Sequence, residues 1–242
     1  MEPYIYIIAL SFLGPFIGTL IGIVKKPSER TMLDMMALAG GVMLEMAFFQ
    51  LIPESIRISS VATCVIGMII GTFFMYLVDR IIPHIHPELC APEYGSKMKK
   101  TALFIFIGMF IHNIPEGMAM SVGMVSNLKL SLITALSIAL HHIPESICTA
   151  APYFYITKSR AKAFLVSIST FIPLMIGFAL GVVLFSSIPT VFMGLVVGAT
   201  AAVMVYISVD ELIPTSCASS ETHSNIFFLM AGVIVVLMLG LL

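Results

Sequence analysis

The sequence predicts an all-α integral membrane protein with eight transmembrane helices. Of its 242 residues, 59% are hydrophobic and only 10% are charged, and the mean hydropathy is +1.07. Soluble domains carry about 25% charged residues, so this composition excludes an ordinary soluble globular protein. The apolar residues fall into eight runs, and an α-helix needs about 20 such residues to cross a bilayer.

The eight runs fill most of the chain, which indicates one transporter-sized transmembrane domain over residues 1–242. The expected spans are residues 4–24, 31–54, 61–82, 101–124, 129–151, 161–185, 189–214 and 225–242. Charged and turn residues occupy the gaps between them, as in the segment Lys25-Lys26-Pro27. The first run follows Met1-Glu2-Pro3 without a basic segment, so we expect a retained helix rather than a cleaved signal peptide.

The positions of lysine and arginine predict the orientation in the membrane. With the N-terminus outside, ten of them lie on the cytoplasmic side, namely Lys25, Lys26, Arg30, Arg80, Lys97, Lys99, Lys100, Lys158, Arg160 and Lys162. Only Arg57 and Lys129 then lie on the outer side. Because cytoplasmic loops are enriched in these residues, we expect both termini to lie outside. The protein is expected in the plasma (cell inner) membrane, with lipid around its helices.

Two other functional classes find no support in the composition. The net charge is −1 and no basic tract occurs, so nothing indicates a nucleic-acid partner. The cysteines Cys64, Cys90, Cys148 and Cys217 have no CxxC spacing. They therefore predict neither a disulfide framework nor a thiolate zinc site.

An internal repeat supports the eight-span interpretation. When Pro53 is aligned with Pro214, residues 40–55 (GGVMLEMAFFQLIPES) and 201–216 (AAVMVYISVDELIPTS) are identical at six of sixteen positions. The two copies lie in spans of opposite direction, and inverted repeats of this kind build many secondary transporters with substrate sites near the midplane. Coincidence between two apolar helices is the alternative.

Two short runs carry the chemistry, and each spaces a histidine and a glutamate four residues apart. They are His112-Asn113-Ile114-Pro115-Glu116 and His141-His142-Ile143-Pro144-Glu145. Side chains four apart share one face of a helix. Each proline also lacks an N–H group, so the carbonyls of Ile111 and Leu140 lose their helical partners. Imidazole nitrogens, carboxylates and freed carbonyls together predict a divalent-cation site.

Both runs are expected near the centre of the bilayer. His112 and His141 lie about ten and twelve residues into their spans, or roughly 15–18 Å at the helical rise. Charged groups at this depth are costly and usually face one another or a water path. Asn113 could add a neutral oxygen or form a helix–helix hydrogen bond, and only one of His141 and His142 is expected to be a direct ligand, because they point about 100° apart.

Further polar residues suggest a route to and from this site. Asp79 ends the third span and Asp210-Glu211 lies near the end of the seventh, where they could relay an ion to the cytosol, form a salt bridge or anchor the interface. Glu45 and Gln50 lie in the second span, and Gln50 aligns with Glu211 in the repeat. Met43 could be a soft ligand, although packing in the core is the stronger interpretation. A loop with His84 and His86 could collect metal loosely, or simply be solvated.

The motifs resemble those of the ZIP (Zrt/Irt-like) family of divalent metal transporters. The matching segments are AGGVML (39–44), LVDRIIPHIHPE (77–88), HNIPEG (112–117), HHIPES (141–146) and VDELIPTS (209–216). The resemblance implies eight helices in a 3+2+3 arrangement, a homodimer, and a metal site between the fourth and fifth helices. It implies central ligands His112, Asn113, Glu116, His142 and Glu145, with His141 and Met43 as additional ones. It places Asp79, Asp210 and Glu211 on the inner route.

The chain departs from the family pattern at two positions. Ile172 precedes Pro173 where members with two metals often carry glutamate. We therefore expect one tightly held metal, with any second ion weak. Ile172→Glu is expected to strengthen the second site if the new acid reaches the cavity and ionises. His142 stands where many relatives have Asn or Asp. More imidazole favours Zn²⁺ and Fe²⁺ over Mg²⁺ and Ca²⁺.

The leading hypothesis is therefore a transporter that moves Zn²⁺, or else Fe²⁺, Mn²⁺ or Cd²⁺, into the cytoplasm. The metal would be the substrate, and no resident cofactor is expected. The alternative is an intramembrane zinc hydrolase, but its usual His-Glu-x-x-His run is absent. A metal sensor without transport is a third possibility, weaker because the polar residues extend from the midplane to the cytoplasmic face.

Overall fold

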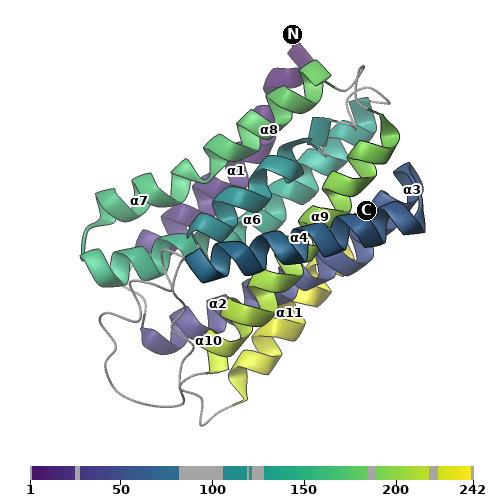
Figure 1. Ribbon diagram of the computed structural model, residues 1–242. Helices are drawn as coiled ribbons and strands as arrows, with labels where there is room; N and C mark the ends of the chain where they lie inside the picture. Colours follow the sequence, from purple (N-terminus) through teal and green to yellow (C-terminus); the bar gives the residue numbers. More distant parts are fainter. Residues whose placement is uncertain are drawn as a thin grey trace.

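The computed structural model describes residues 2–24, 28–81, 106–118, 120–121, 128–184, 189–217 and 223–240. Within these ranges every regular element is helical and no strand occurs, which confirms the all-α prediction (Figure 1). In this described part of the chain, five segments are long and apolar enough to cross a membrane, namely Ile5–Val24, Arg30–Ile58, Val61–Arg80, Arg160–Val183 and Thr190–Cys217. Ser224–Met238 is a shorter apolar helix.

The first part of the chain contains α1 (Glu2–Val24), α2 (Glu29–Glu45), the π-helix η1 (Met46–Leu51), α3 (Ile52–Ile58) and α4 (Val61–Ile81). Residues 106–118 are also helical. The second part contains α6 (Leu128–Thr157), α7 (Arg160–Ser169), α8 (Phe171–Leu184), α9 (Thr190–Ile207), η2 (Ser208–Leu212), α10 (Ile213–Cys217) and α11 (Ser224–Gly240).

Several of the expected spans differ from the helices in the structure, and the second and seventh continue to Ile58 and Cys217 rather than ending at residues 54 and 214. The fifth continues to Thr157 rather than ending at residue 151, and the sixth is divided into α7 and α8 around Thr170. The loop with His84 and His86 lies outside the described residues, as do Lys25, Lys26, Lys97, Lys99 and Lys100.

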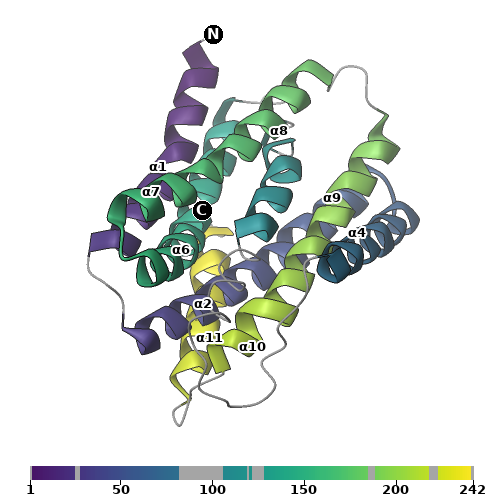
Figure 2. The same ribbon diagram turned by 60° about the vertical axis from the view of Figure 1, so that its left-hand side comes forward.

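The helices pack as two groups that meet along α2 and α6. In one group, α1 packs against α6 and α7, and α7 leads into α8. In the other, α4 packs against α9, and α11 packs against α2. Figures 1 and 2 show the first group on one side of the molecule and the second on the other. The contact between α2 and α6 joins them.

Glycines allow the closest helix contacts within the first group. A methyl at Gly14 of α1 would overlap the backbone of Ala139 on α6, and one at Gly177 of α8 would overlap the carbonyl of Ile114. Helices in lipid gain little from burying apolar surface, so close packing of small residues is a principal source of their association. Gly177 therefore fixes α8 directly against the helix of residues 106–118.

The two π-helices occupy the positions that the repeat aligns. Ile52 donates its N–H to Ala47 in η1, and Ile213 donates to Ser208 in η2, each reaching five residues back. A proline follows immediately in both cases and has no N–H to continue the α-helical pattern. Because α9 contacts η1 and α3, while α2 contacts η2 and α10, the two segments run antiparallel.

Candidate metal site

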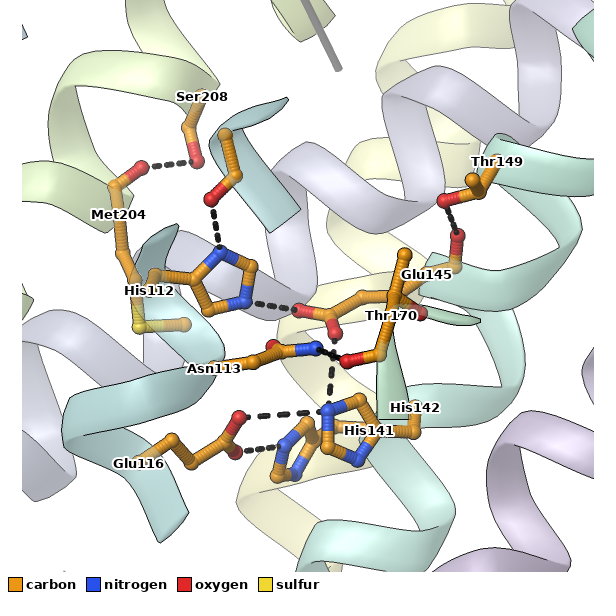
Figure 3. Close-up of polar contacts among 11 residues, drawn as sticks. His112, Asn113, Glu116, His141, His142, Glu145, Thr149, Thr170, Met204 and Ser208 are labelled. Atoms are coloured by element: carbon orange, nitrogen blue, oxygen red, sulfur yellow. Dashed lines mark hydrogen bonds and ion pairs between the residues drawn. The ribbon is translucent and has the colours of Figure 1, made fainter. Parts of the chain in front are cut away.

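Six polar side chains from two helices form a buried cluster in the interior of the molecule (Figure 3). Residues 106–118 contribute three of them and α6 the other three. They are His112, Asn113, Glu116, His141, His142 and Glu145, and none is more than 4% exposed. The spacing of four within each motif places the side chains on facing surfaces, as the sequence predicts.

Glu116 faces two imidazoles at once. Its Oε1 contacts Nε2 of His141, and its Oε2 lies 3.3 Å from Nε2 of His142. One nitrogen from each histidine and one oxygen of Glu116 all lie within 4.8 Å of one another. These three residues can therefore supply ligand atoms to a single cation.

Glu145 extends the cluster towards His112. Its Oε2 lies 3.5 Å from Nε2 of His142, and its Oε1 lies 3.8 Å from Nε2 of His112. His142 thus lies between the two carboxylates. Two donor atoms that are each about 2.1 Å from a tetrahedral zinc ion are separated by about 3.4 Å. The separations in the cluster are close to this value.

The backbone fixes the tautomer of His112. Its Nδ1 lies 2.9 Å from the carbonyl oxygen of Gly108. A carbonyl can only accept a hydrogen bond, so Nδ1 must carry the proton and donate. In the neutral ring, Nε2 then keeps its lone pair, and this atom is directed at Glu145. A hydrogen bond of this kind commonly orients a metal-binding histidine.

Many polar atoms of the cluster have no hydrogen-bond partner among the residues that the structure describes. They are His112 Nε2, Asn113 Oδ1, Glu116 Oε2, His141 Nδ1, His142 Nε2, and both carboxylate oxygens of Glu145. Such groups are costly when buried, and most buried polar atoms in proteins are satisfied. A divalent cation compensates both the unsatisfied lone pairs and the two carboxylate charges, so the donor set fits zinc.

Asn113 is held by a neighbouring helix junction. Its Nδ2 donates a 2.7 Å hydrogen bond to the carbonyl oxygen of Thr170, between α7 and α8. The helix–helix hydrogen bond raised by the sequence is therefore formed. Among the described residues the amide oxygen has no partner, so it is still free to bind a cation.

Comparison with known proteins identifies the family. A family model described as ZIP Zinc transporter matches residues 90–240. A protein from Salmonella arizonae named Zinc transporter ZupT is 32% identical over 231 residues, covering 93% of this chain and 89% of that protein. A protein of the same name from Enterobacter sp. strain 638 is 30% identical over 226 residues, covering 90% and 88%.

The chain belongs to the ZIP zinc transporter family. This confirms the family that the motifs suggested. The family is one of transporters, in which zinc is the substrate carried and not a cofactor. The hydrolase alternative therefore finds no support.

Glu45 and Met43 lie on α2, outside the buried cluster of six polar side chains described above. Glu45 is 3% exposed, accepts a 3.2 Å hydrogen bond from Nε2 of Gln50, and interacts electrostatically with His141. Met43 is fully buried and belongs to an apolar cluster that includes Met46, Met109 and Met204. The packing interpretation thus fits Met43, while Glu45 borders the site.

Asp79, Asp210 and Glu211 form a separate polar group on α4 and η2. The hydroxyl of Tyr206 donates to Oδ2 of Asp79 at 3.3 Å, and the charges of Asp79 and Asp210 both act on the buried Glu211. The structure therefore brings together the three acids that the sequence assigned to the inner route, with Tyr206 as an unexpected member.

Ile172 does not face the cluster. Its side chain is 54% exposed on α8, so a glutamate at this position would point away from the interior. The second site was expected to be strengthened by Ile172→Glu only if the new acid reaches the cavity, and the exposed position of residue 172 does not meet this condition.

Sequence reasoning missed Gly108, Thr170 and Tyr206. Gly108 and Thr170 act through backbone carbonyls, which leave no side-chain signal. Pro173 does indicate a possible helix start just after Thr170, because proline is tolerated in the first turn. Tyr206 aligns with Glu45 in the repeat, and this alignment with a polar residue could have identified Tyr206 as a candidate.

Proposed function

We propose that this ZIP-family chain carries Zn²⁺ across the membrane into the cytoplasm, with Fe²⁺, Mn²⁺ and Cd²⁺ as further candidate substrates. The observation that carries the proposal is the position of His142 between two carboxylates. Its Nε2 lies 3.3 Å from Oε2 of Glu116 and 3.5 Å from Oε2 of Glu145, in a cluster whose metal-binding atoms largely lack hydrogen-bond partners among the described residues. The relatives named as zinc transporters support the choice of metal.

The proposed ligands are imidazole nitrogens, carboxylate oxygens and one amide oxygen. They belong to His112, Asn113, Glu116, His141, His142 and Glu145, between the helix of residues 106–118 and α6. Without a cation the two carboxylates repel each other, and entry of a dication stabilises the closed cluster. Three imidazoles favour a borderline metal such as Zn²⁺ over Mg²⁺.

The path through the protein follows the remaining acids. Glu45 guides a cation towards His141 from the outer side, where Met43 offers only apolar contact or a weak sulfur donor. Asp79, Asp210 and Glu211 receive the ion on the way to the cytoplasm. The site is exposed alternately to each side, as in other secondary transporters.

The architecture proposed for the whole chain is one domain over residues 1–242, with eight transmembrane helices in a 3+2+3 arrangement and an inverted repeat. The antiparallel packing of the second and seventh spans and their matching π-helices support the repeat. The protein is proposed to lie in the inner membrane as a homodimer surrounded by lipid, with both termini outside.

Purified protein in liposomes gives the direct test. Zinc is added outside and a zinc-sensitive dye is enclosed, with Fe²⁺, Mn²⁺, Cd²⁺ and Mg²⁺ tested in parallel. We expect uptake of Zn²⁺, none of Mg²⁺, and none of Zn²⁺ after Glu116→Ala. Zinc binding without uptake in well-sealed vesicles would favour the sensor and contradict transport.

A further inference from the structure

The junction between α7 and α8 makes a polar contact with the candidate metal site. Thr170 is 5% exposed, and its carbonyl oxygen accepts the 2.7 Å hydrogen bond from Nδ2 of Asn113. In Figure 3, this contact joins Asn113 to Thr170 beside the imidazole and carboxylate groups. The junction thus reaches the site through its backbone.

We propose that the α7–α8 junction is a positioning element, which turns the amide of Asn113 so that its oxygen, and not its nitrogen, faces the transported cation. The inference rests on the proposed function, because it assumes that a divalent cation binds in the cluster. It assigns to Thr170 and Ser167 a role in metal affinity although neither is a ligand.

The chemistry of the two groups makes this orientation obligatory. A carbonyl oxygen accepts hydrogen bonds but cannot donate them, so the atom of Asn113 that faces Thr170 must be the NH₂ nitrogen. Its Oδ1 is then directed away from Thr170, and it is buried without a partner among the described residues. Only this oxygen has lone pairs suited to a cation, because the amide nitrogen carries two protons and is not a donor to metals.

A network of hydroxyl groups holds the junction against two other helices. The hydroxyl of Ser167 donates to the carbonyl of Ser146 on α6 at 3.2 Å. It therefore accepts from the hydroxyl of Thr19 on α1, at 2.7 Å. The hydroxyl of Thr170 donates in turn to the carbonyl of Ser167 at 2.7 Å. Ser167 is fully buried. Through these bonds it fixes the position of the Thr170 carbonyl oxygen relative to the Asn113 amide.

Substitution of Asn113 tests the orientation. In Asn113→Asp, an oxygen would face the Thr170 carbonyl without a proton between them, so the new side chain loses its anchor. We expect the KM for zinc uptake to rise at least about tenfold, as after loss of other groups that support a metal site, and to match that of Asn113→Ala. A lower KM in Asn113→Asp, which the extra negative charge alone would produce, overturns the proposal.

Substitution of Ser167 tests the network and has a matched control. Among the described residues, the hydroxyl of Ser169 bonds only within its own helix, donating to the carbonyl of Val166 at 2.7 Å. We expect Ser167→Ala to raise the KM for zinc about fivefold, the effect of one lost hydrogen bond, with little change in the maximal rate. Ser169→Ala should leave both unchanged. Equal KM values for the two variants overturn the proposal.

A double substitution separates positioning from general destabilisation. If Ser167 acts through Asn113, then adding Ser167→Ala to Asn113→Ala should not change the KM further, because the group that it positions is gone. A full additional increase in the double variant overturns the proposal. Absence of zinc uptake by the wild-type protein would instead contradict the proposed function itself, so the two failures are distinguishable.

Discussion

Glu116 is the carboxylate that connects the two imidazoles of α6, because its oxygens lie against Nε2 of His141 and 3.3 Å from Nε2 of His142. A neutral amide in its place would keep the volume but remove one of two negative charges. Since a buried dication needs compensating charge, this residue is expected to matter more for metal binding than for folding.

The first prediction concerns Glu116 and His112. Loss of a group that merely supports a metal site typically costs about 10- to 100-fold, and loss of a ligand should cost more. We therefore expect the zinc uptake of Glu116→Gln and of His112→Ala to fall below about 1% of wild type, which is beyond a 100-fold loss. Both variants should keep the size-exclusion elution profile of the wild type in detergent. Uptake is measured in liposomes.

Glu54 offers the control for these substitutions. It forms a surface ion pair with Arg57 at 2.5 Å, and pairs of this kind contribute little to stability. Glu54→Gln should transport zinc normally. Near-normal uptake by both Glu116→Gln and His112→Ala would contradict the proposed site.

The second prediction concerns the number of metals. Ile172 and Ile176 are 54% and 46% exposed on α8, so a glutamate at either position faces away from the cluster. We expect one tightly bound zinc per chain in the wild type, and the same number in Ile172→Glu and Ile176→Glu. Metal content of the purified proteins is the measurement. Two tightly bound zinc ions per chain in the wild type would contradict this prediction. An additional bound zinc in Ile172→Glu but not in Ile176→Glu would contradict it as well.

At the residue scale, the sequence predicts the members of the cluster but not the atoms that they present. His112, Glu116 and Glu145 are identifiable because ionisable groups in apolar helices must face a partner. The tautomer of His112 and the direction of the Asn113 amide depend on the carbonyls of Gly108 and Thr170. These contacts follow from helix geometry and packing, which side-chain patterns do not encode.

At the element scale, the π-helices bring together residues that a regular helix keeps apart. Glu45 and Gln50 are five residues apart and would point about 140° from each other in an α-helix. In the structure, Nε2 of Gln50 lies 3.2 Å from Oε2 of Glu45, because η1 inserts one residue into the turn between them. The periodicity of the sequence gives no sign of this, although the aligned Pro53 and Pro214 mark where both π-helices end.

The third prediction concerns the contact of α8 with the helix that carries the site. A methyl at Gly177 would overlap the carbonyl of Ile114, so Gly177→Ala forces these helices apart. Overpacking of this kind costs about 1–3 kcal/mol. We expect a lower thermal denaturation midpoint in detergent and weaker zinc uptake.

Ala179 provides the comparison on the same helix, because it lies on the exposed face of α8. Ala179→Val adds more volume than Gly177→Ala, but on an exposed face it meets no neighbouring backbone among the described residues. It should leave both stability and uptake unchanged. Equal denaturation midpoints for the two variants would show that α8 does not pack as described.

At the scale of the whole molecule, the hydrogen bonds between helix ends define two opposite faces. Arg160 donates to the carbonyl of Val24 at 3.0 Å, which places the end of α1 beside the start of α7. Ser224 donates to Asp34 at 2.9 Å, which places the start of α11 beside the first turns of α2. On the other face, Ser55 donates to the carbonyl of Gly194 and ties α3 to the start of α9.

Charge separates these faces in the same way. Among the described side chains, the first face carries Arg30, Arg80, Lys158, Arg160 and Lys162, and the second carries Arg57. The chain order alone predicts this division, because each span reverses the direction of the one before. What the sequence could not provide is the pairing of particular ends, which the Arg160 and Ser224 contacts supply.

The last prediction is the orientation of these faces in the membrane. Since positively charged residues favour the cytoplasmic side, the face with Arg160 should be cytoplasmic. Ser60, between α3 and α4, and Lys162, in α7, are both exposed and lie on opposite faces. Cysteine at either position can be labelled in a background of Cys90→Ser and Cys217→Ser, because Cys64 and Cys148 are buried. An impermeant maleimide applied to intact cells should label Ser60→Cys at once, and Lys162→Cys only after the membrane is permeabilised. Labelling of Lys162→Cys alone in intact cells would reverse the orientation and, with it, the proposed direction of the inner route.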